Sequence, residues 1–313
     1  MTSTPAQLML NIAAVERDTR IGKDALRVWE RRYGFPNPQR DTNGERLYPP
    51  EQVERLRIVK RLLDAGHRPG RVVALELPEL HRLSEQIRES EQARVPPGHL
   101  SPGAMPEIEQ IIRLVKNHDP VPLRRRFAQI ILRIGLARFV LDVAIPLMQE
   151  IGQAWASGEL HIFEEHLCSE VLETSLRSAL AGAPDPTSAN RPRVVMSTFP
   201  GESHGLGLLM AETLFMVEGC TCMNLGTQTP LHDIINAARA HRADIVAISF
   251  SAAANPVQAH DALVELRAML NPVVQLWAGT SHPTLLRRTP DGVQLLSNLG
   301  HIAENVLRWR QQQ

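Results

Sequence analysis

A carboxylate and a histidine lie two residues apart in the glycine-rich segment 201–207, GESHGLG. The neutral imidazole of His204 is a metal ligand, and Glu202 is placed to hydrogen-bond the other ring nitrogen and fix the tautomer. Gly205 and Gly207 would leave room for a bulky group over the backbone. The segment lies between apolar runs typical of a strand and a helix. The competing interpretation is that His204 is an ordinary polar loop residue, and other features of the chain are needed to choose between the two.

Composition limits the class of protein. The 313 residues are 43% hydrophobic and 22% charged, which predicts two or three globular domains. No apolar run approaches the length of a membrane span, and the first ten residues lack the order of a signal peptide, so we expect a cytoplasmic protein without membrane partners. The three cysteines make no disulfide framework. Cys220 and Cys222 alternate in direction on a predicted strand, which favours core thiols over a metal pair.

The net charge of zero conceals a basic segment. Between residues 20 and 61 there are eleven Lys or Arg against six Asp or Glu. Such a local excess indicates nucleic-acid binding, with a solvated surface as the alternative. The same segment predicts two short helices, 12–18 and 23–32, joined by a tight turn. Asn43-Gly44 predicts a hairpin after them, and a helix over 51–64 follows.

The stretch 10–80 resembles the winged-helix DNA-binding domain of the MerR family of transcription regulators. The resemblance rests on residues 25–30 (ALRVWE), on Gly-x-Arg-x-Tyr at 44–48 and on LDAG at 63–66. It implies that the second helix enters the major groove of operator DNA and that the hairpin, or wing, contacts the adjacent backbone. The residues in these positions are Lys23, Arg27 and Arg31 on the helix, and Arg40, Arg46 and Tyr48 on the wing. Core packing between helix and wing is the favoured alternative role for Trp29 and Tyr48.

Proline- and glycine-rich residues 93–105 predict a linker, and residues 106–184 predict a bundle of four helices. The four helical pieces are 106–117, 120–134, 137–157 and 161–183, with a kink at Pro146. Composition alone makes Trp155 a core residue and Glu165-His166 the edge of an amphipathic helix. The spacing Trp, nine residues, Glu-His resembles the bundle of light-responsive regulators of the CarH/LitR type. In those regulators it caps the upper face of adenosylcobalamin.

Alternating strands and helices over 185–313 predict a Rossmann-like domain with a mostly parallel sheet. The expected strands are 193–198, 220–225, 244–250, 273–278 and 293–296. The loops that follow three of them resemble the cobalamin-binding domain. They carry Glu202, His204 and Gly207, then Ser249 and Ser251, then Gly279. Thr280 follows Gly279 where the family often has a second glycine, which predicts a tighter groove for the cofactor tail.

The fold class predicted is therefore multidomain: a winged helix-turn-helix (1–92), a linker, a helical bundle and a Rossmann-like cobalamin-binding domain. The resemblance implies a repressor that uses adenosylcobalamin as a light sensor, with His204 as the lower axial ligand of cobalt. It would form a homo-oligomer, dimer to tetramer, on operator DNA in the dark and release the DNA on photolysis. Ala156 replaces a histidine that light-sensing relatives use as an upper ligand.

Two other functions stay open: a light-independent sensor of corrinoids or other tetrapyrroles, and the corrinoid carrier of a methyltransferase. No nucleophile–base pair, phosphate-binding loop or paired-carboxylate site is evident in the sequence, so we expect a protein that is not an enzyme.

Overall fold

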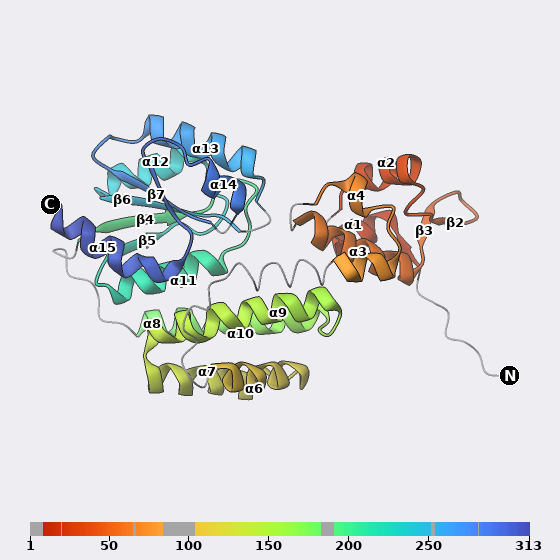
Figure 1. Cartoon of the computed structure of the whole chain (residues 1–313), viewed down its shortest axis with the longest axis horizontal. Coiled ribbons are helices and arrows are strands. Elements are labelled where there is room, and N and C mark those ends of the chain that lie inside the picture. Colours follow the sequence, from red (N-terminus) through yellow and green to blue (C-terminus); the bar gives the residue numbers. More distant parts are fainter. Residues whose placement is uncertain are drawn as a thin grey trace. The chain divides into compact units, whose positions relative to one another are not determined.

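The computed structural model describes residues 9–19, 21–64, 67–83, 104–182, 191–251, 254–280 and 282–313 (Figure 1). The chain divides into two compact units. One is built from the N-terminal residues up to 96, and the other from residue 97 onward apart from the short segment 156–159. In the part of the chain that the structure describes, no helix is long and apolar enough to cross a membrane.

The N-terminal unit packs its helices on a small antiparallel sheet whose strand order is β1-β3-β2. Its core includes Leu26, Trp29 and Leu56, which lie at helical spacing on the inner faces of their helices. A further helix begins at residue 77, and the structure describes it to residue 83. The elements are β1 (Leu10–Asn11), α1 (Ile12–Thr19), α2 (Lys23–Tyr33), β2 (Gln39–Arg40), β3 (Arg46–Tyr48), α3 (Pro50–Asp64) and α4 (Pro69–Val72).

The wing is the hairpin between β2 and β3, in which Arg40 pairs with Arg46. Oδ1 of Asp41 accepts hydrogen bonds from the backbone N–H groups of Asn43 and Glu45, both at 2.8 Å. Gly44 has φ of 80°, the left-handed conformation that a side chain would disfavour. The predicted Asn43-Gly44 turn is therefore present, within a slightly longer loop that begins at Asp41.

The second unit begins with the helical bundle, and its main irregularity precedes Pro146. The ring of a proline clashes with the carbonyl four residues earlier and supplies no N–H group, so the preceding turn cannot stay α-helical. Ahead of Pro146, where the sequence predicts a kink, the helix widens into a π-helical segment, η1 (Phe139–Ala144), which leads directly into α9. The helices are α6 (Ala104–Lys116), α7 (Pro120–Ile134), α8 (Leu136–Arg138), α9 (Ile145–Ser157) and α10 (Ile162–Ala181).

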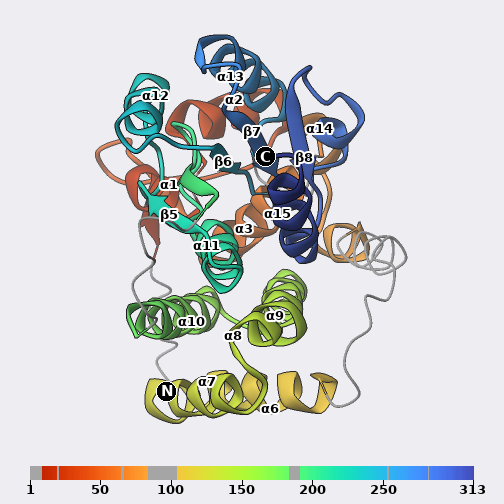
Figure 2. The ribbon, with the colours of Figure 1, turned by 90° about the vertical axis from the view of Figure 1, so that its left-hand side faces the viewer.

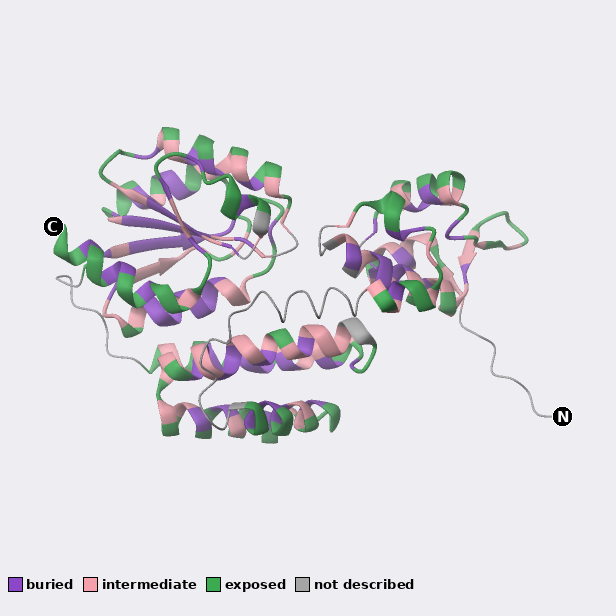
Figure 3. Ribbon diagram, in the orientation of Figure 1, coloured by how far each residue is buried: buried purple, intermediate pink, exposed green. Residues whose placement is uncertain are grey.

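The same unit contains a five-stranded parallel sheet of order β5-β4-β6-β7-β8. The three central strands, β4, β6 and β7, have mostly apolar and buried interiors because helices cover both faces, as Figure 3 shows by the buried colour of the sheet interior. The strands are β4 (Arg193–Ser197), β5 (Thr221–Asn224), β6 (Ile245–Ser249), β7 (Gln275–Gly279) and β8 (Val293–Leu296), and the helices are α11 (Leu206–Val217), α12 (Leu231–Ala240), α13 (Pro256–Met269), α14 (Pro283–Arg287) and α15 (Ile302–Gln311). Helix α14 lies in a stretch where the sequence predicts no helix.

One continuous apolar core joins the bundle to one face of the sheet. Helices α11 and α15 cover that face, and α12 and α13 cover the other (Figure 2). Helix α10 packs against α11. A carbon of Leu141 in the π-helical segment lies 3.8 Å from the Cβ that Gly300, just before α15, would carry as alanine. The bundle and the sheet therefore form one body, with α11 between them.

Candidate functional site

Two loops meet where the strand order of the large sheet reverses. Strand β4 lies between β5 and β6, although the chain visits β5 before it crosses to β6. The loop after β4 carries Glu202 and His204, and the loop after β6 carries Ser251. Ligands of open α/β sheets bind in the crevice outside the carboxyl ends of the strands at such a reversal.

Glu202 joins these two loops through both of its carboxylate oxygens. Oε1 accepts hydrogen bonds from the backbone N–H of His204 at 2.9 Å and from its ring Nδ1 at 2.6 Å. Oε2 accepts from the backbone N–H of Ser251 at 2.9 Å and from its hydroxyl at 2.7 Å. The backbone carbonyl of Glu202 accepts from Thr198, which also binds the backbone N–H of Gln228. The buried Glu202 is thus the fixed point of the site.

The bonding of Glu202 sets its charge and the tautomer of His204. Burial alone would raise the pKa of the Glu202 carboxyl, but the hydrogen bonds from His204 and Ser251 outweigh it and lower that pKa to about 2. A carboxylate next to Nδ1 keeps the proton of a neutral imidazole on Nδ1, so Nε2 carries the lone pair that can bind a metal. The side chain of His204 is about half exposed, at 53%, while its carboxylate partner is buried.

Small residues line a path from His204 into the molecule. A Cβ at Gly205 would lie only 3.2 Å from a methyl of Thr227, so a larger residue there would need Thr227 to shift. Gly207 lies against Ser249, whose hydroxyl would be 3.5 Å from an added Cβ. Ser249 in turn pairs with Gly279 across β6 and β7.

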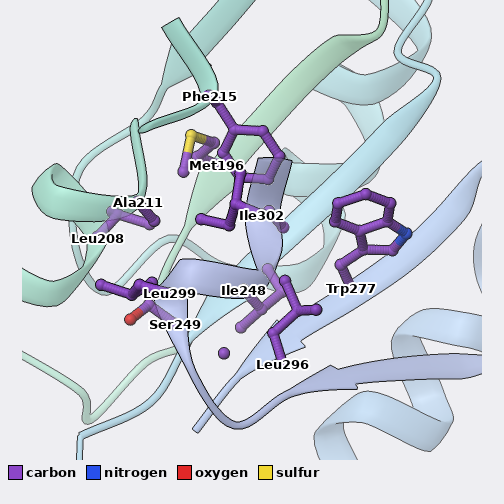
Figure 4. A pocket seen from close by; sticks show the side chains of 12 residues that line it. Met196, Leu208, Ala211, Phe215, Ile248, Ser249, Trp277, Leu296, Leu299 and Ile302 are labelled. Carbon is purple, nitrogen blue, oxygen red and sulfur yellow. The ribbon is translucent and has the colours of Figure 1, made fainter. Parts of the chain in front are cut away.

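A cavity of about 30 Å³ opens behind these small residues, between the sheet and helices α11 and α15 (Figure 4). That space holds roughly two water molecules, because one probe sphere of water fills about 10–15 Å³. A ring system would enter only if the surrounding side chains moved apart. The lining residues are Met196, Leu208, Ala211, Phe215, Ala247, Ile248, Ser249, Trp277, Gly279, Leu296, Leu299 and Ile302.

On the bundle, the predicted upper-face residues lie on α9 and α10. Trp155 is partly buried and packs against the shared core. Nδ1 of His166 lies 2.6 Å from Oε2 of Glu165, and the hydroxyl of Ser169 donates to Oε1 of Glu165 at 2.8 Å. The first turns of α10 lie at the end of the unit where the sheet strands finish (Figure 1). Each predicted histidine therefore has a serine-anchored glutamate at its Nδ1.

A further cluster, which the sequence reading missed, fixes the start of α10. Buried Glu164 accepts the backbone N–H of His161 at 2.7 Å, and its Oε1 lies 2.8 Å from Nε2 of His118. Burial raises the pKa of Glu164, and these two histidines outweigh that effect and lower it. The ring of His161 stacks on Phe163. A glutamate three residues after a helix cap is the sequence signal that could have revealed this arrangement.

The predicted DNA-contacting residues of α2 lie on its outer surface. Arg27 and Arg31 are exposed, and Lys23 is half-buried with its ammonium 3.4 Å from Glu16. On the wing, Arg40 is exposed and donates to the carbonyl of Gly44. Arg46 instead pairs with Glu30 of α2 at 2.7 Å and is only 26% exposed. The pair braces the wing against the helix.

One predicted DNA contact requires correction. The side chain of Tyr48 is fully buried, so it cannot reach DNA and belongs to the core of the N-terminal unit. Tyr48 and Arg46 are two residues apart on β3 and so share one face of the strand, on which Arg46 meets Glu30 of α2 and Tyr48 is buried in the core. The favoured alternative role, packing together with Trp29, is the one that the structure has.

Family models match three parts of the chain. Residues 10–75 match the MerR HTH family regulatory proteins. Residues 107–179 and 192–293 each match a B12 binding domain, and these ranges cover the bundle and the sheet. The monomethylamine corrinoid protein of Methanosarcina barkeri has the same fold over 64% of this chain and 96% of its own, with a TM-score of 0.51 and 13% identity.

Curated relatives extend the similarity over most of the chain. The HTH-type transcriptional repressor CarH of Myxococcus xanthus is 29% identical over 274 residues, which cover 86% of this chain and 87% of CarH. The repressor CarA of the same organism is 30% identical over 255 residues, which cover 80% and 79%. With the DNA-binding unit, the bundle and the sheet domain matched in this order, the chain belongs to the MerR-family transcription regulators that carry a cobalamin-binding domain, the CarH type.

Proposed function

We propose that this regulator is a repressor that uses bound adenosylcobalamin as a light sensor. In the dark it would assemble as an oligomer on operator DNA, and light would release it. The observation that carries the proposal is the Ser251–Glu202–His204 arrangement at the strand reversal, in which Glu202 contacts Nδ1 of His204, so that Nε2 would be the nitrogen that binds a metal. Both Myxococcus relatives are named as repressors, which supports the sign of regulation.

The residues present fit a corrinoid. A corrinoid carries its own cobalt, so the protein would need to supply only one side-chain ligand, and His204 would be that ligand, with the buried carboxylate of Glu202 holding its ring. The small residues Gly207, Ser249 and Gly279 leave a passage beside it, and an apolar cavity follows.

Different residues of the protein would contact the two faces of the corrin ring. His204 would bind the lower face of cobalt, with Glu202 holding the ring, while the cofactor tail would pass Ser249 and Gly279 into the cavity. Trp155, Glu165 and His166 would cover the upper face. When bound, adenosylcobalamin supplies an absorber of green light whose cobalt–carbon bond is photolabile. A ligand shifts assembly only by its different affinity for the two assembly states, so contacts of the bundle with the upper ligand would carry the signal.

DNA release would follow from loss of avidity. Several winged helices on one operator bind far more tightly than one, because linked units raise the effective concentration of each other. Disassembly can then release DNA without a change in any contact of α2 or the wing. The bundle packs on α11, which begins two residues after His204, so events at the cofactor can reach the outer surface of the bundle.

A light-independent corrinoid sensor is the second candidate. The observation that favours it is Ala156, which stands where light-sensing relatives have a histidine able to take the vacated upper position. A corrinoid carrier of a methyltransferase shares the fold of the second unit, but the matched DNA-binding unit argues against that class.

The deciding experiment compares the purified full chain with adenosylcobalamin before and after green light. We expect a protein-bound spectrum that changes on illumination, together with loss of operator binding in a gel-shift assay. A spectrum that changes while DNA binding does not would leave a light-independent regulator. Absence of any bound corrinoid would overturn the proposal.

A further inference from the structure

The first turn of α10 is held by a buried carboxylate. Oε2 of Glu164 accepts the backbone N–H of His161, the residue that caps the helix, at 2.7 Å. Glu164 is only 5% exposed, and a charge buried this deeply is costly unless its oxygens find partners. The partner of Oε1 is Nε2 of His118, at 2.8 Å, in the turn between α6 and α7. A histidine from another pair of helices thus completes the bonding of the carboxylate that holds α10.

His118 reaches Glu164 from a left-handed backbone conformation. Its φ is 58°, in a region that few residues other than glycine adopt, although His and Asn enter it more readily than most. Its backbone N–H donates to the carbonyl of Val115 at 3.0 Å, which fixes the turn. Its ring packs edge-on against Phe163, with 4.9 Å between the ring centroids. A half-exposed side chain that is held by these contacts, at a cost in the backbone, indicates a specific role.

The residues directly after Glu164 are the predicted upper-face pair of α10. Oε2 of Glu165 contacts Nδ1 of His166, and Oε1 of Glu165 accepts from the hydroxyl of Ser169. All three residues follow the turn that Glu164 holds, so the direction in which the helix starts sets where they lie. Helices α6 and α7 form the layer of the bundle that faces away from the sheet, and α9 and α10 lie between that layer and the sheet (Figure 2). The contact between His118 and Glu164 therefore ties the start of α10 to the outer layer.

We propose that His118 is a positioning residue for the upper face of the corrinoid. Acting through Glu164, it fixes the start of α10 so that Glu165 and His166 fit a cobalamin that carries a bulky upper ligand. The inference rests on the proposed function, which takes these two residues to cover that face. It adds that a residue without contact to the corrinoid sets the preference for one upper ligand over another.

The size of the upper ligand sets the expected effect. The residues of α10 would have to contact an adenosyl group, and a misplacement of about 1 Å in such a contact can cost about a hundredfold. A hydroxo ligand is too small to need those contacts, so its binding would depend on the residues of the lower face. Loss of the His118–Glu164 contact should therefore weaken the binding of adenosylcobalamin about tenfold or more and change that of hydroxocobalamin by less than about threefold.

Two substitutions at position 118 separate this contact from the backbone conformation. His118→Asn suits the left-handed backbone, but its shorter side chain does not reach Glu164. His118→Gln places an amide nitrogen near the position of Nε2, from which it can donate to Oε1 of Glu164. Any backbone strain of the glutamine is the same with either corrinoid, so it cancels in the ratio of the two dissociation constants. His241→Asn, at the exposed C-terminal end of α12, is the matched control.

Titration calorimetry of the full chain in the dark measures the dissociation constants of adenosylcobalamin and hydroxocobalamin. His118→Asn should shift their ratio by about tenfold or more, while His118→Gln and the control should keep the ratio of the parent. Binding of hydroxocobalamin in the same titrations shows that each variant is folded. In the cofactor-free chain, the backbone amides in the first turn of α10 should exchange hydrogen faster in His118→Asn than in the parent, because the turn has lost its support.

An equal loss of affinity for both corrinoids, an unchanged ratio, or a ratio that His118→Gln does not restore would overturn the positioning role. His166→Ala distinguishes that result from a failure of the proposed function. If the ratio responds to His166→Ala but not to His118→Asn, the proposed function stands without this inference. If the ratio responds to neither, α10 does not cover the upper face, and the inference fails together with that part of the proposed function.

Discussion

Nδ1 of His204 lies 2.6 Å from Oε1 of Glu202, a carboxylate that is buried and held from the other side by Ser251. The contact joins the loops after two adjacent parallel strands into one rigid arrangement. The buried carboxylate of Glu202 also fixes the orientation of the half-exposed imidazole. The ring can therefore bind a ligand outside the sheet while its hydrogen bond to Glu202 is kept.

Removing the imidazole is the first test. His204→Ala should lose axial ligation and much of the corrinoid affinity, because the cobalt bond and the tail passage act together. Glu202→Gln should keep ligation but weaken affinity by roughly ten- to hundredfold, as changes in the partner of a ligating histidine do. The measurement is electron paramagnetic resonance of the reduced corrinoid with ring-nitrogen-labelled histidine.

The rival explanation for that experiment is a cofactor that keeps its own base on cobalt. If the nitrogen coupling changes neither with the label nor with His204→Ala, the cofactor keeps its own base on cobalt. His204 would then not be the cobalt ligand. Partly exposed His260 on α13 supplies the matched control, since His260→Ala should leave the signal and the affinity unchanged.

Acid should weaken the cofactor-free protein through Glu202. Its folded-state pKa of about 2 is below the ordinary value of 4.5, so its contribution to stability is full above pH 4.5 and is lost as pH falls from about 4.5 towards 2. The shift corresponds to about 3 kcal/mol in the free energy of unfolding. Urea unfolding at a series of pH values measures it.

In that series Glu202→Gln should flatten the pH dependence between pH 4.5 and 3, whereas Glu304→Gln, an exposed pair member on α15, should not. Parallel curves for the parent and Glu202→Gln would show that the Glu202 hydrogen bonds do not contribute to stability.

The residue at position 156 should decide the ligand left after light. In the parent protein we expect water on the upper face of cobalt, seen as a reversible spectral change between water and hydroxide on raising the pH. Ala156→His should abolish that change, because a second imidazole replaces the water. Glu159→His, on the exposed turn, serves as control. A parent spectrum that already lacks the water titration would contradict this expectation.

DNA affinity should depend on salt through the exposed arginines of the N-terminal unit. Arg40→Ala should weaken binding across sequences and reduce the slope of log affinity against log salt by about 0.9, as expected for one lost phosphate contact. Arg239→Ala on the exposed side of α12 should have no effect. Arg46→Ala should also lower the stability of this unit, since it breaks the 2.7 Å pair with Glu30. Binding without salt dependence would disprove the basic-surface model.

Adenosylcobalamin in the dark should raise the solution mass to a dimer or a tetramer, and light should lower it. The physical reason is that oligomer contacts would depend on a bundle held in place by the upper ligand. Light scattering of the full chain at fixed concentration measures the mass, with hydroxocobalamin as the control ligand. One mass under all conditions would eliminate the light switch and retain a constitutive regulator.

The sequence determined most of the local structure. The spacing of apolar residues located the five parallel strands and the bundle helices within a few residues. It could do so because strands and helices each place apolar side chains at a characteristic period, which is visible in the sequence itself. The Asn43-Gly44 turn and the break before Pro146 were also local consequences of backbone chemistry. The pairing of Glu202 with His204 was expected for the same reason, since the two residues are neighbours in one loop.

The tertiary structure alone decided the contacts between distant segments. Ser251 reaches Glu202 only because β4 and β6 are adjacent in the sheet, although β5 separates them in the chain. Tyr48 was predicted on the wing surface as well as in the core, and only the packing of β3 on the helices placed it inside. His118 and Glu164 meet across 46 positions, and the cavity draws its lining from four strands, from helices α11 and α15 and from the short turn before α15. Such contacts depend on how the helices and strands pack together, and the spacing of residues along the chain does not predict that packing.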